Sequence, residues 1–251
     1  MDFVAPHFDN RETYTGPTAE VMVLSTPHAG AEAVCSLLYN NGIGTPHEYF
    51  QPYHSLPALA RQVGLAEITS DNMHRITAFL KMKRSRGGWF SYNLHASHHG
   101  IWRTFRPSLD AAEMLDGSVL LYCRRGDLMA QTAACYIAHR IEIGMNTTAD
   151  EELAGLLQTF DEDLCVRLHQ VLLRQRTMAD QIFDQEQRRF REVQVLNQED
   201  TWSERCRQIA QVLPIHDARI PPVSVRTDLK QLVLEQMRSS EAVLEVSDGP
   251  R

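Results

Sequence analysis

The stretch VMVLSTPHAGAEAVCSLLYN, residues 21–40, decides the fold of this chain. Its first four residues are an apolar run, short enough for a buried strand. A turn follows at 26–30. The next residues, 31–39, have helical character and end at the helix stop Asn40-Asn41-Gly42. The order of strand, glycine-containing loop and helix predicts a βα unit near the start of the chain.

The same alternation of short apolar runs and helical stretches continues along the chain. Further strands are expected at 89–94, 119–123 and 193–196, and helices at two places within 56–84 and at 128–143, 150–193, 202–212 and 226–238. This order predicts an α/β fold in which a parallel sheet is flanked by helices. Right-handed crossovers then place the loops after the strands along one edge. We expect one domain over 1–251, with an irregular lead-in at 1–19 and a loose tail at 239–251.

Composition narrows the class of protein. The 251 residues are 43% hydrophobic and 23% charged, with a formal net charge of −7. The acidic balance argues against sequence-independent binding of nucleic acid, which needs a concentrated basic surface. The five cysteines are odd in number and form no C-x-x-C pair, so we expect reduced thiols in a cytoplasmic protein. We see no signal peptide, and no apolar run approaches the ~18 residues that span a bilayer.

The loop at 26–30 has the features of an anion-binding site. The first N–H groups of a helix have no intrahelical partner, and the helix dipole places partial positive charge there. Gly30 would let the backbone approach a phosphate closely. On this pattern alone an ordinary turn remains the more common explanation.

Four short motifs carry a resemblance to known proteins, and only three of them are specific. They are T-P-x-x-G at 26–30, P-x-E-Y-F at 46–50, WFSYNLH at 89–95 and LYCRRGDLMAQTAA at 121–134. In their residues and spacing they resemble the PAPS-dependent sulfotransferases, of the bacterial trehalose 2-sulfotransferase type. The resemblance covers most of the chain and implies a P-loop-like sulfotransferase fold. It also implies transfer of sulfate from PAPS (3′-phosphoadenosine 5′-phosphosulfate) to a carbohydrate or glycolipid hydroxyl, and a possible homodimer.

The resemblance assigns the first loop to the 5′-phosphosulfate of PAPS. The residues concerned are Thr26, Pro27, His28, Ala29, Gly30, Ala31 and Glu32. His28 stands where the family has an arginine and would assist at the 5′ end, while two serines and a threonine are replaced by Ala29, Ala31 and Glu32. The Glu32 carboxylate either points to solvent and stabilises the helix, or fills the anion site itself. Both alternatives remain open.

The resemblance assigns the segment after the third predicted strand to the 3′-phosphate. Arg124 is the retained cation, because its planar guanidinium can bond phosphate in two places. Gln131 matches the family pattern, whereas Ala134 replaces a serine and loses one hydroxyl donor. We expect Asp127 to cap the following helix. The alternative is that Arg124 and Arg125 only pair with surface carboxylates.

The resemblance makes Glu48 the catalytic base, since sulfuryl transfer needs an acceptor for the hydroxyl proton. The lysine that the family carries in the following strand is here Asn93. His95, His98 and His99 could help to bind an anion, but their spacing is no specific metal signature, so we predict no metal site. Two alternatives to an active PAPS-dependent sulfotransferase stay open. The first is an inactive relative that serves as a binding or regulatory partner, and the second is an enzyme whose site is remodelled for another donor or substrate, with His28 and Glu32 as acid–base groups.

Overall fold

The computed structural model describes residue 9 and residues 16–69, 71–109, 117–143, 160–219, 227–240 and 242–243. Four parallel strands form one sheet in the order β2-β1-β3-β4. Their bounds are Ala19–Ser25 (β1), Trp89–His95 (β2), Val119–Arg124 (β3) and Glu192–Asn197 (β4). All seven residues of β1 are buried, as expected of a central strand covered on both faces. The parallel α/β architecture predicted from the sequence is confirmed.

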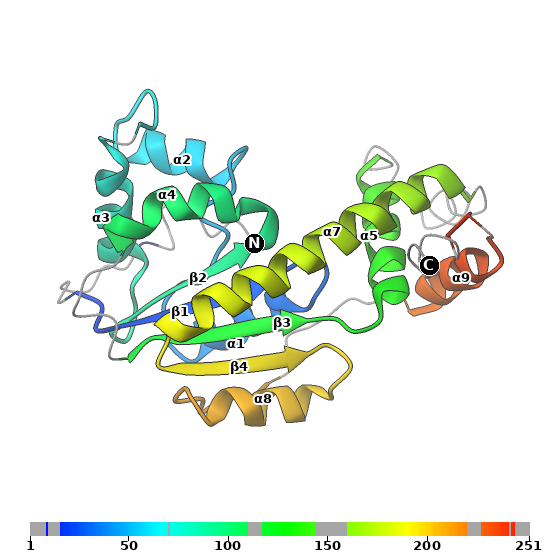
Figure 1. Cartoon of the computed structure of the whole chain (residues 1–251). Coiled ribbons are helices and arrows are strands. Elements are labelled where there is room, and N and C mark those ends of the chain that lie inside the picture. Colours follow the sequence, from blue (N-terminus) through cyan, green and yellow to red (C-terminus); the bar gives the residue numbers. More distant parts are fainter. Residues whose placement is uncertain are drawn as a thin grey trace.

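One face of the sheet is covered by α1 (Ala31–Asn40) and α8 (Trp202–Ala210), as Figure 1 shows. Alternate residues of β1, such as Val21 and Val23, point to this side and pack against Val34 of α1 and Ile209 of α8. Because α1 follows β1 directly, its N-terminus lies at the carboxyl end of the strand.

The other face is covered by α2 (Ser55–Gln62), α3 (Met73–Arg84), α4 (His99–Leu109) and the second half of α7 (Glu162–Glu186) (Figure 1). Here the intervening strand residues, such as Met22 and Leu24, meet Trp102 of α4 and Ile182 of α7. A short 3₁₀ turn, η2 (Ala96–His98), joins β2 to α4, and another, η4 (Gln187–Arg189), follows α7.

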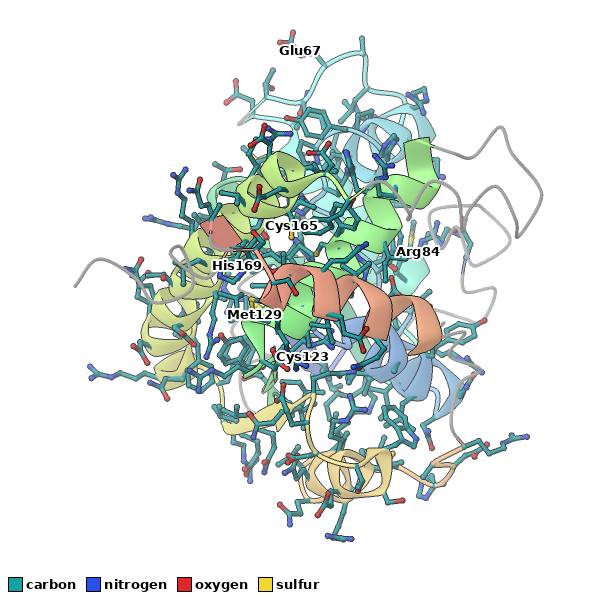
Figure 2. The ribbon with its side chains drawn as sticks, turned by 90° about the vertical axis from the view of Figure 1, so that its right-hand side faces the viewer. Glu67, Arg84, Cys123, Met129, Cys165 and His169 are labelled. Carbon is teal, nitrogen blue, oxygen red and sulfur yellow. The ribbon has the colours of Figure 1, made fainter. Side chains whose placement is uncertain are left out.

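The first half of α7 packs away from the sheet against α5 (Leu128–Ile143) and α9 (Thr227–Arg238). Figure 2 shows Met129, Cys165 and His169 where these three helices meet. Thr132 Oγ1 of α5 lies 2.9 Å from His169 Nδ1 of α7, and both residues are buried. The long α7 thus ties this helical group to the sheet.

The structure corrects several sequence expectations. Helix α4 was not expected, although its buried residues Trp102, Phe105, Arg106 and Leu109 have helical spacing. The helix expected over 150–193 ends at Glu186, and Phe190 beyond it is buried against the sheet. Its expected start falls partly outside the described residues, as do most of 1–19 and of 239–251. Val243, within the expected loose tail, is buried in the α5–α7–α9 group.

Candidate functional site

The parallel strands bring the four motifs to one edge of the sheet. The loop after β1, the end of β2 at His95 and the loop after β3 at Arg124 all lie at the carboxyl ends of adjacent strands. The segment at 46–50 joins the same edge, because the Asn93 N–H of β2 donates to the His47 carbonyl at 3.0 Å. Parallel α/β sheets bind ligands at this edge.

The β1–α1 junction leaves the start of a helix without a side-chain cap. Gly30 precedes α1 with φ of 85°, a left-handed conformation that glycine adopts without strain, and it makes no side-chain capping bond. His28 also has positive φ, at 54°, and its side chain is exposed. The N-terminal N–H groups of α1 are therefore positioned for an anion.

Two side chains from the neighbouring strand–helix unit hold this loop in place. Gln131 of α5 is buried, and its amide nitrogen donates to Thr26 Oγ1 at 2.8 Å and to the Pro27 carbonyl. Arg125 Nη1 donates to the His28 carbonyl at 3.1 Å. The structure thus uses the Gln131 nitrogen to fasten the loop, a task that its place in the family motif did not reveal.

The β3–α5 junction has the same topology but is already capped. Glu199 Oε1, from the loop after β4, accepts hydrogen bonds from the N–H groups of Gly126 (2.9 Å) and Asp127 (3.1 Å). Asp127 Oδ1 accepts from the Ala130 N–H at 2.8 Å, as the sequence predicts. Burial favours the neutral form of Glu199, but these backbone hydrogen bonds outweigh it and lower the pKa of its carboxyl group.

Arg124, the residue assigned to the 3′-phosphate, faces a carboxylate of α7. Its Nε lies 3.6 Å from Asp180 Oδ1, which also accepts a hydrogen bond from the Tyr122 hydroxyl at 2.7 Å. The Arg124 side chain is 42% exposed, so it remains accessible to a ligand. Ala134 lies on α5 one turn beyond Gln131 and is half-buried. Sequence reasoning missed Glu199, whose loop lies far from the motifs.

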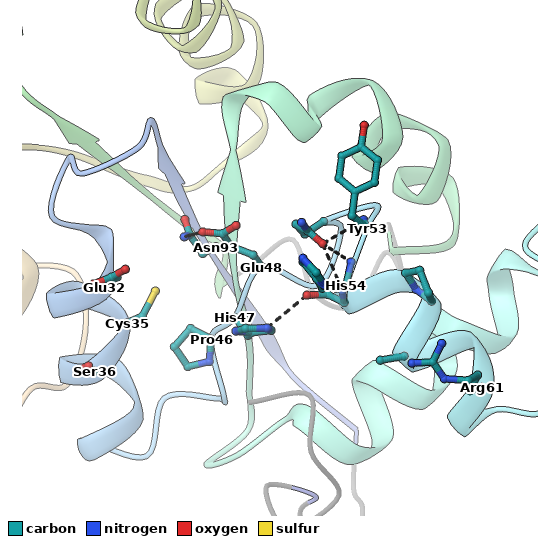
Figure 3. Close-up of a pocket in the computed structure, with 14 residues that line it drawn as sticks. Glu32, Cys35, Ser36, Pro46, His47, Glu48, Tyr53, His54, Arg61 and Asn93 are labelled. Carbon is teal, nitrogen blue, oxygen red and sulfur yellow. Dashed lines mark hydrogen bonds between the residues drawn. The ribbon is translucent and has the colours of Figure 1, made fainter. Parts of the chain in front are cut away.

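A cavity of about 920 Å³ opens beside the β1–α1 junction, between α1 and the segment that leads into α2. Figure 3 shows Glu32 and Cys35 of α1 on one side, Glu48 and Asn93 between, and Tyr53, His54 and Arg61 on the other side. The remaining lining residues are Ser36, Pro46, His47, Gln51, Ser55, Pro57 and Ala58. Charged and polar side chains from several elements therefore converge on one space.

Glu48 is the carboxylate best placed for acid–base chemistry in this cavity. Burial raises the pKa of its carboxyl group, and the negative charge of Glu32 raises it further. Asn93 Nδ2 donates to Glu48 Oε1 at 3.2 Å, and Asn93 Oδ1 accepts from Ser25 Oγ at 3.0 Å. These contacts orient one carboxylate oxygen of Glu48 and hold it at the end of β2.

Glu32 borders the same cavity, and its side chain is exposed (Figure 3). Glu48 lines this cavity too, and the negative charge of Glu32 raises the pKa of the Glu48 carboxyl group. Glu32 therefore lies on the cavity side of α1 and contributes negative charge next to Glu48. Ala29 and Ala31 are buried and pack with the α1–α8 core, so their side chains contribute no polar group.

The histidines after β2 have separate surroundings. The rings of His95 and His98 are 5.6 Å apart, whereas His99 stacks on Trp102 at 5.4 Å. Burial lowers the pKa of His95 to about 4, with further contributions from His98 and His28. Within the described residues no three His, Cys, Asp or Glu side chains are grouped as a metal site requires. Burial and the positive charges of His98 and His28 thus all favour the neutral form of His95.

The five cysteines are buried and unpaired. No helix in the described part of the chain has the length and apolar character to cross a membrane.

No protein-family model matches this chain, and neither does any curated protein. The chemistry of the site is therefore inferred from its own residues. They are an uncapped helix start, a carboxyl group of raised pKa and a cavity beside both.

Proposed function

We propose that this protein transfers sulfate from PAPS to a hydroxyl group of a carbohydrate or glycolipid, with a P-loop-like sulfotransferase fold. The position of Glu48 carries the proposal. This carboxylate has a raised pKa and lines the cavity of about 920 Å³ next to the uncapped start of α1. Transfer to an alcohol requires a base close to an oxyanion cradle, and Glu32 in the first turn of α1 lines the same cavity as Glu48.

In the proposed reaction the acceptor hydroxyl oxygen attacks the sulfur of PAPS. The bond between sulfur and the bridging phosphate oxygen breaks, and 3′-phosphoadenosine 5′-phosphate leaves. Glu48 takes the hydroxyl proton. The N–H groups at the start of α1, with His28 beside them, stabilise the negative charge of the transferring group and the 5′-phosphate. Arg124 contacts the 3′-phosphate from the adjacent junction.

The cavity suits a polar acceptor with many hydroxyl groups. His54, Arg61 and Gln51 offer hydrogen-bonding side chains along its wall. Tyr53 also lines it and is 81% exposed, which leaves its ring free to stack on the apolar face of a sugar. These features favour a sugar over a small apolar alcohol.

The test begins with a calorimetric titration of the native protein with 3′-phosphoadenosine 5′-phosphate. The protein is then incubated with PAPS and a panel of mono- and disaccharides, and products are detected by mass. We expect binding at micromolar concentration and a mass gain equal to one sulfate. Glu48→Gln should abolish transfer and keep nucleotide binding, and Arg124→Gln should weaken nucleotide binding. The exposed Arg188→Gln is the matched control. Absence of nucleotide binding up to millimolar concentration would refute the proposal.

A second candidate is a binding or regulatory protein that has lost sulfuryl transfer. The observation in its favour is the β3–α5 junction, where the Glu199 carboxylate already bonds the N–H groups of Gly126 and Asp127. The apolar Ala29, Ala31 and Ala134 favour it as well, since none can donate a hydrogen bond from its side chain. Under this alternative the titration shows no nucleotide binding, and restoring the loop with His28→Arg, Ala29→Ser, Ala31→Ser and Glu32→Thr creates it.

A further inference from the structure

A buried arginine of α8 stands beside the β1–α1 loop. Arg205 is 9% exposed, and its guanidinium stacks over the Trp202 ring, with Cζ 5.1 Å from the ring centroid. Its Nη1 donates to Gln198 Oε1 at 2.6 Å. Gln198 in turn is held at the end of the sheet, because its N–H donates to the Arg124 carbonyl at 2.8 Å. Neither residue belongs to a motif that the sequence singled out.

The Arg205–Gln198 pair is packed directly against Gly30. A Cβ atom at Gly30 would lie 2.0 Å from Gln198 Oε1 and 3.1 Å from Arg205 Nη1. The neutral amide oxygen of Gln198 therefore occupies space next to the residue that opens α1. It accepts a hydrogen bond from a cation there, as an oxygen of a bound anion would.

The charge of Arg205 is not balanced within the described part of the chain. No acidic side chain described there forms a salt bridge with it. Its buried Nε has no hydrogen-bond partner among the described residues. Burying a cation without a counter-ion is costly, and the positive end of the α1 dipole next to it adds to the cost. An anion bound at this loop would balance both the charge of Arg205 and the positive end of the α1 dipole.

We propose that Arg205 is the principal side-chain cation of a tetrahedral oxyanion site at the β1–α1 loop, for a sulfate, phosphate or phosphosulfate group. The oxyanion displaces the half-buried Gln198 side chain and accepts hydrogen bonds from the guanidinium and from the N–H groups at Gly30 and Ala31. The inference rests on the proposed function in placing the anionic part of the donor at this loop. It does not require that the ligand be PAPS.

The experiment measures binding of inorganic sulfate to the full chain by thermal shift and by amide chemical shifts, with sodium chloride as the ionic-strength control. We expect the Gly30 and Ala31 amide signals to move on addition of sulfate. Arg205→Gln should weaken sulfate binding at least about tenfold, because hydrogen bonds to a charged group contribute that much. Arg207→Gln, an exposed arginine on the same helix, should leave binding unchanged.

Two further variants separate a binding role from a folding role. Gln198→Ala removes the competing oxygen and should tighten sulfate binding. Gln198→Glu places a carboxylate against Arg205, so it should raise the melting temperature without sulfate and abolish sulfate binding. Three outcomes would overturn the proposal. The first is unchanged sulfate binding in Arg205→Gln, and the second is an equal loss of binding in Arg205→Gln and Arg207→Gln. The third is no binding by the native chain up to 100 mM sulfate, roughly the weakest affinity that a built site would show.

A parallel titration with 3′-phosphoadenosine 5′-phosphate distinguishes this proposal from the proposed function. Arg205-dependent sulfate binding without nucleotide binding upholds the oxyanion site and refutes the sulfotransferase. Nucleotide binding that Arg205→Gln leaves unchanged supports the sulfotransferase and refutes the oxyanion site built on Arg205.

Discussion

The β1–α1 and β3–α5 junctions have the same topology but differ in the side chains that surround them. Each leads from a buried parallel strand into a helix at the same edge of the sheet. At the first, Gly30 precedes the helix in a left-handed conformation without a side-chain cap. At the second, Glu199 accepts from the N–H groups of Gly126 and Asp127 just before the helix, and Asp127 accepts from the Ala130 N–H in its first turn.

The difference shows that topology alone does not make an anion site. A helix start attracts an anion only while its N–H groups lack other acceptors. The β1–α1 junction meets that condition and has Arg205 beside it, whereas the β3–α5 junction holds a carboxylate of its own chain. Under the proposed function, the charged group of the donor binds at the first junction and Arg124 reaches the donor from the second.

Matched glycine substitutions test the comparison with the largest expected effect. Gly30→Ala puts a side chain at φ of 85° and against Gln198, and it should lower the free energy of unfolding by about 2 kcal/mol. Gly126→Ala meets only Glu199 at 3.4 Å and should change it by less than about 0.5 kcal/mol. Urea denaturation measures both. Equal losses would mean that the two junctions do not differ in this way.

The histidines beside the first junction predict a loss of stability in acid. Burial lowers the pKa of His95 to about 4, so the unfolded chain binds its proton first as the pH falls. Between pH ~6.5 and ~5 this residue alone should remove about 1–2 kcal/mol of stability. Urea denaturation against pH should show a shallower decline in His95→Asn. The exposed His216→Asn should follow the native curve, and a His95→Asn curve identical to the native one would contradict the prediction.

Removing the built-in carboxylate of the second junction sharpens the comparison further. Glu199→Ala frees the N–H groups of Gly126 and Asp127, and it should cost up to about 1 kcal/mol, reduced by the exposure of this side chain. Because the pKa of Glu199 is lowered, its contribution is present above the pKa of the unfolded chain and lost as the pH falls through the folded value.

The same Glu199→Ala variant should gain sulfate binding at the second junction, seen as amide shifts at Gly126 and Asp127. Glu192→Ala, an exposed glutamate of β4, is the control. If Glu199→Ala leaves both stability and sulfate binding as in the native chain, the carboxylate does not stand in for an anion.

The smallest expected effect concerns the two glutamates at the first junction. Burial first and the charge of Glu32 second raise the pKa of Glu48. Glu32→Gln removes the second cause, so the Glu48 carboxyl group should ionise at lower pH. Carboxyl carbon NMR measures this directly, and under the proposed function the acidic limb of kcat/KM should move to lower pH. The exposed Glu67→Gln should have no effect on the titration of Glu48. An unchanged titration of Glu48 in Glu32→Gln would show that the two carboxylates do not influence each other.

Much of the fold was predictable because strands and helices here follow local patterns. The buried run of β1, the helix stop after Tyr39 and the helix at 128–143 all match the structure. Helix α4 was missed because Gly100 near its start and Pro107 near its end are poor helix formers, although the buried residues from Trp102 onward have helical spacing. The end of α7 was missed because Phe190 continues the apolar pattern although it packs after a 3₁₀ turn.

The sequence by itself determined the class of fold and which loops share an edge, since parallel strands with right-handed crossovers leave few other arrangements. It also indicated Glu48 and the β1–α1 loop through short motifs. Only the tertiary structure decided which groups face these residues. Glu199, Gln198 and Arg205 come from the loop after β4 and from α8, and they reach the two junctions because β4 pairs with β3. Occupancy of a helix start depends on side chains distant in sequence, so no local pattern could reveal it.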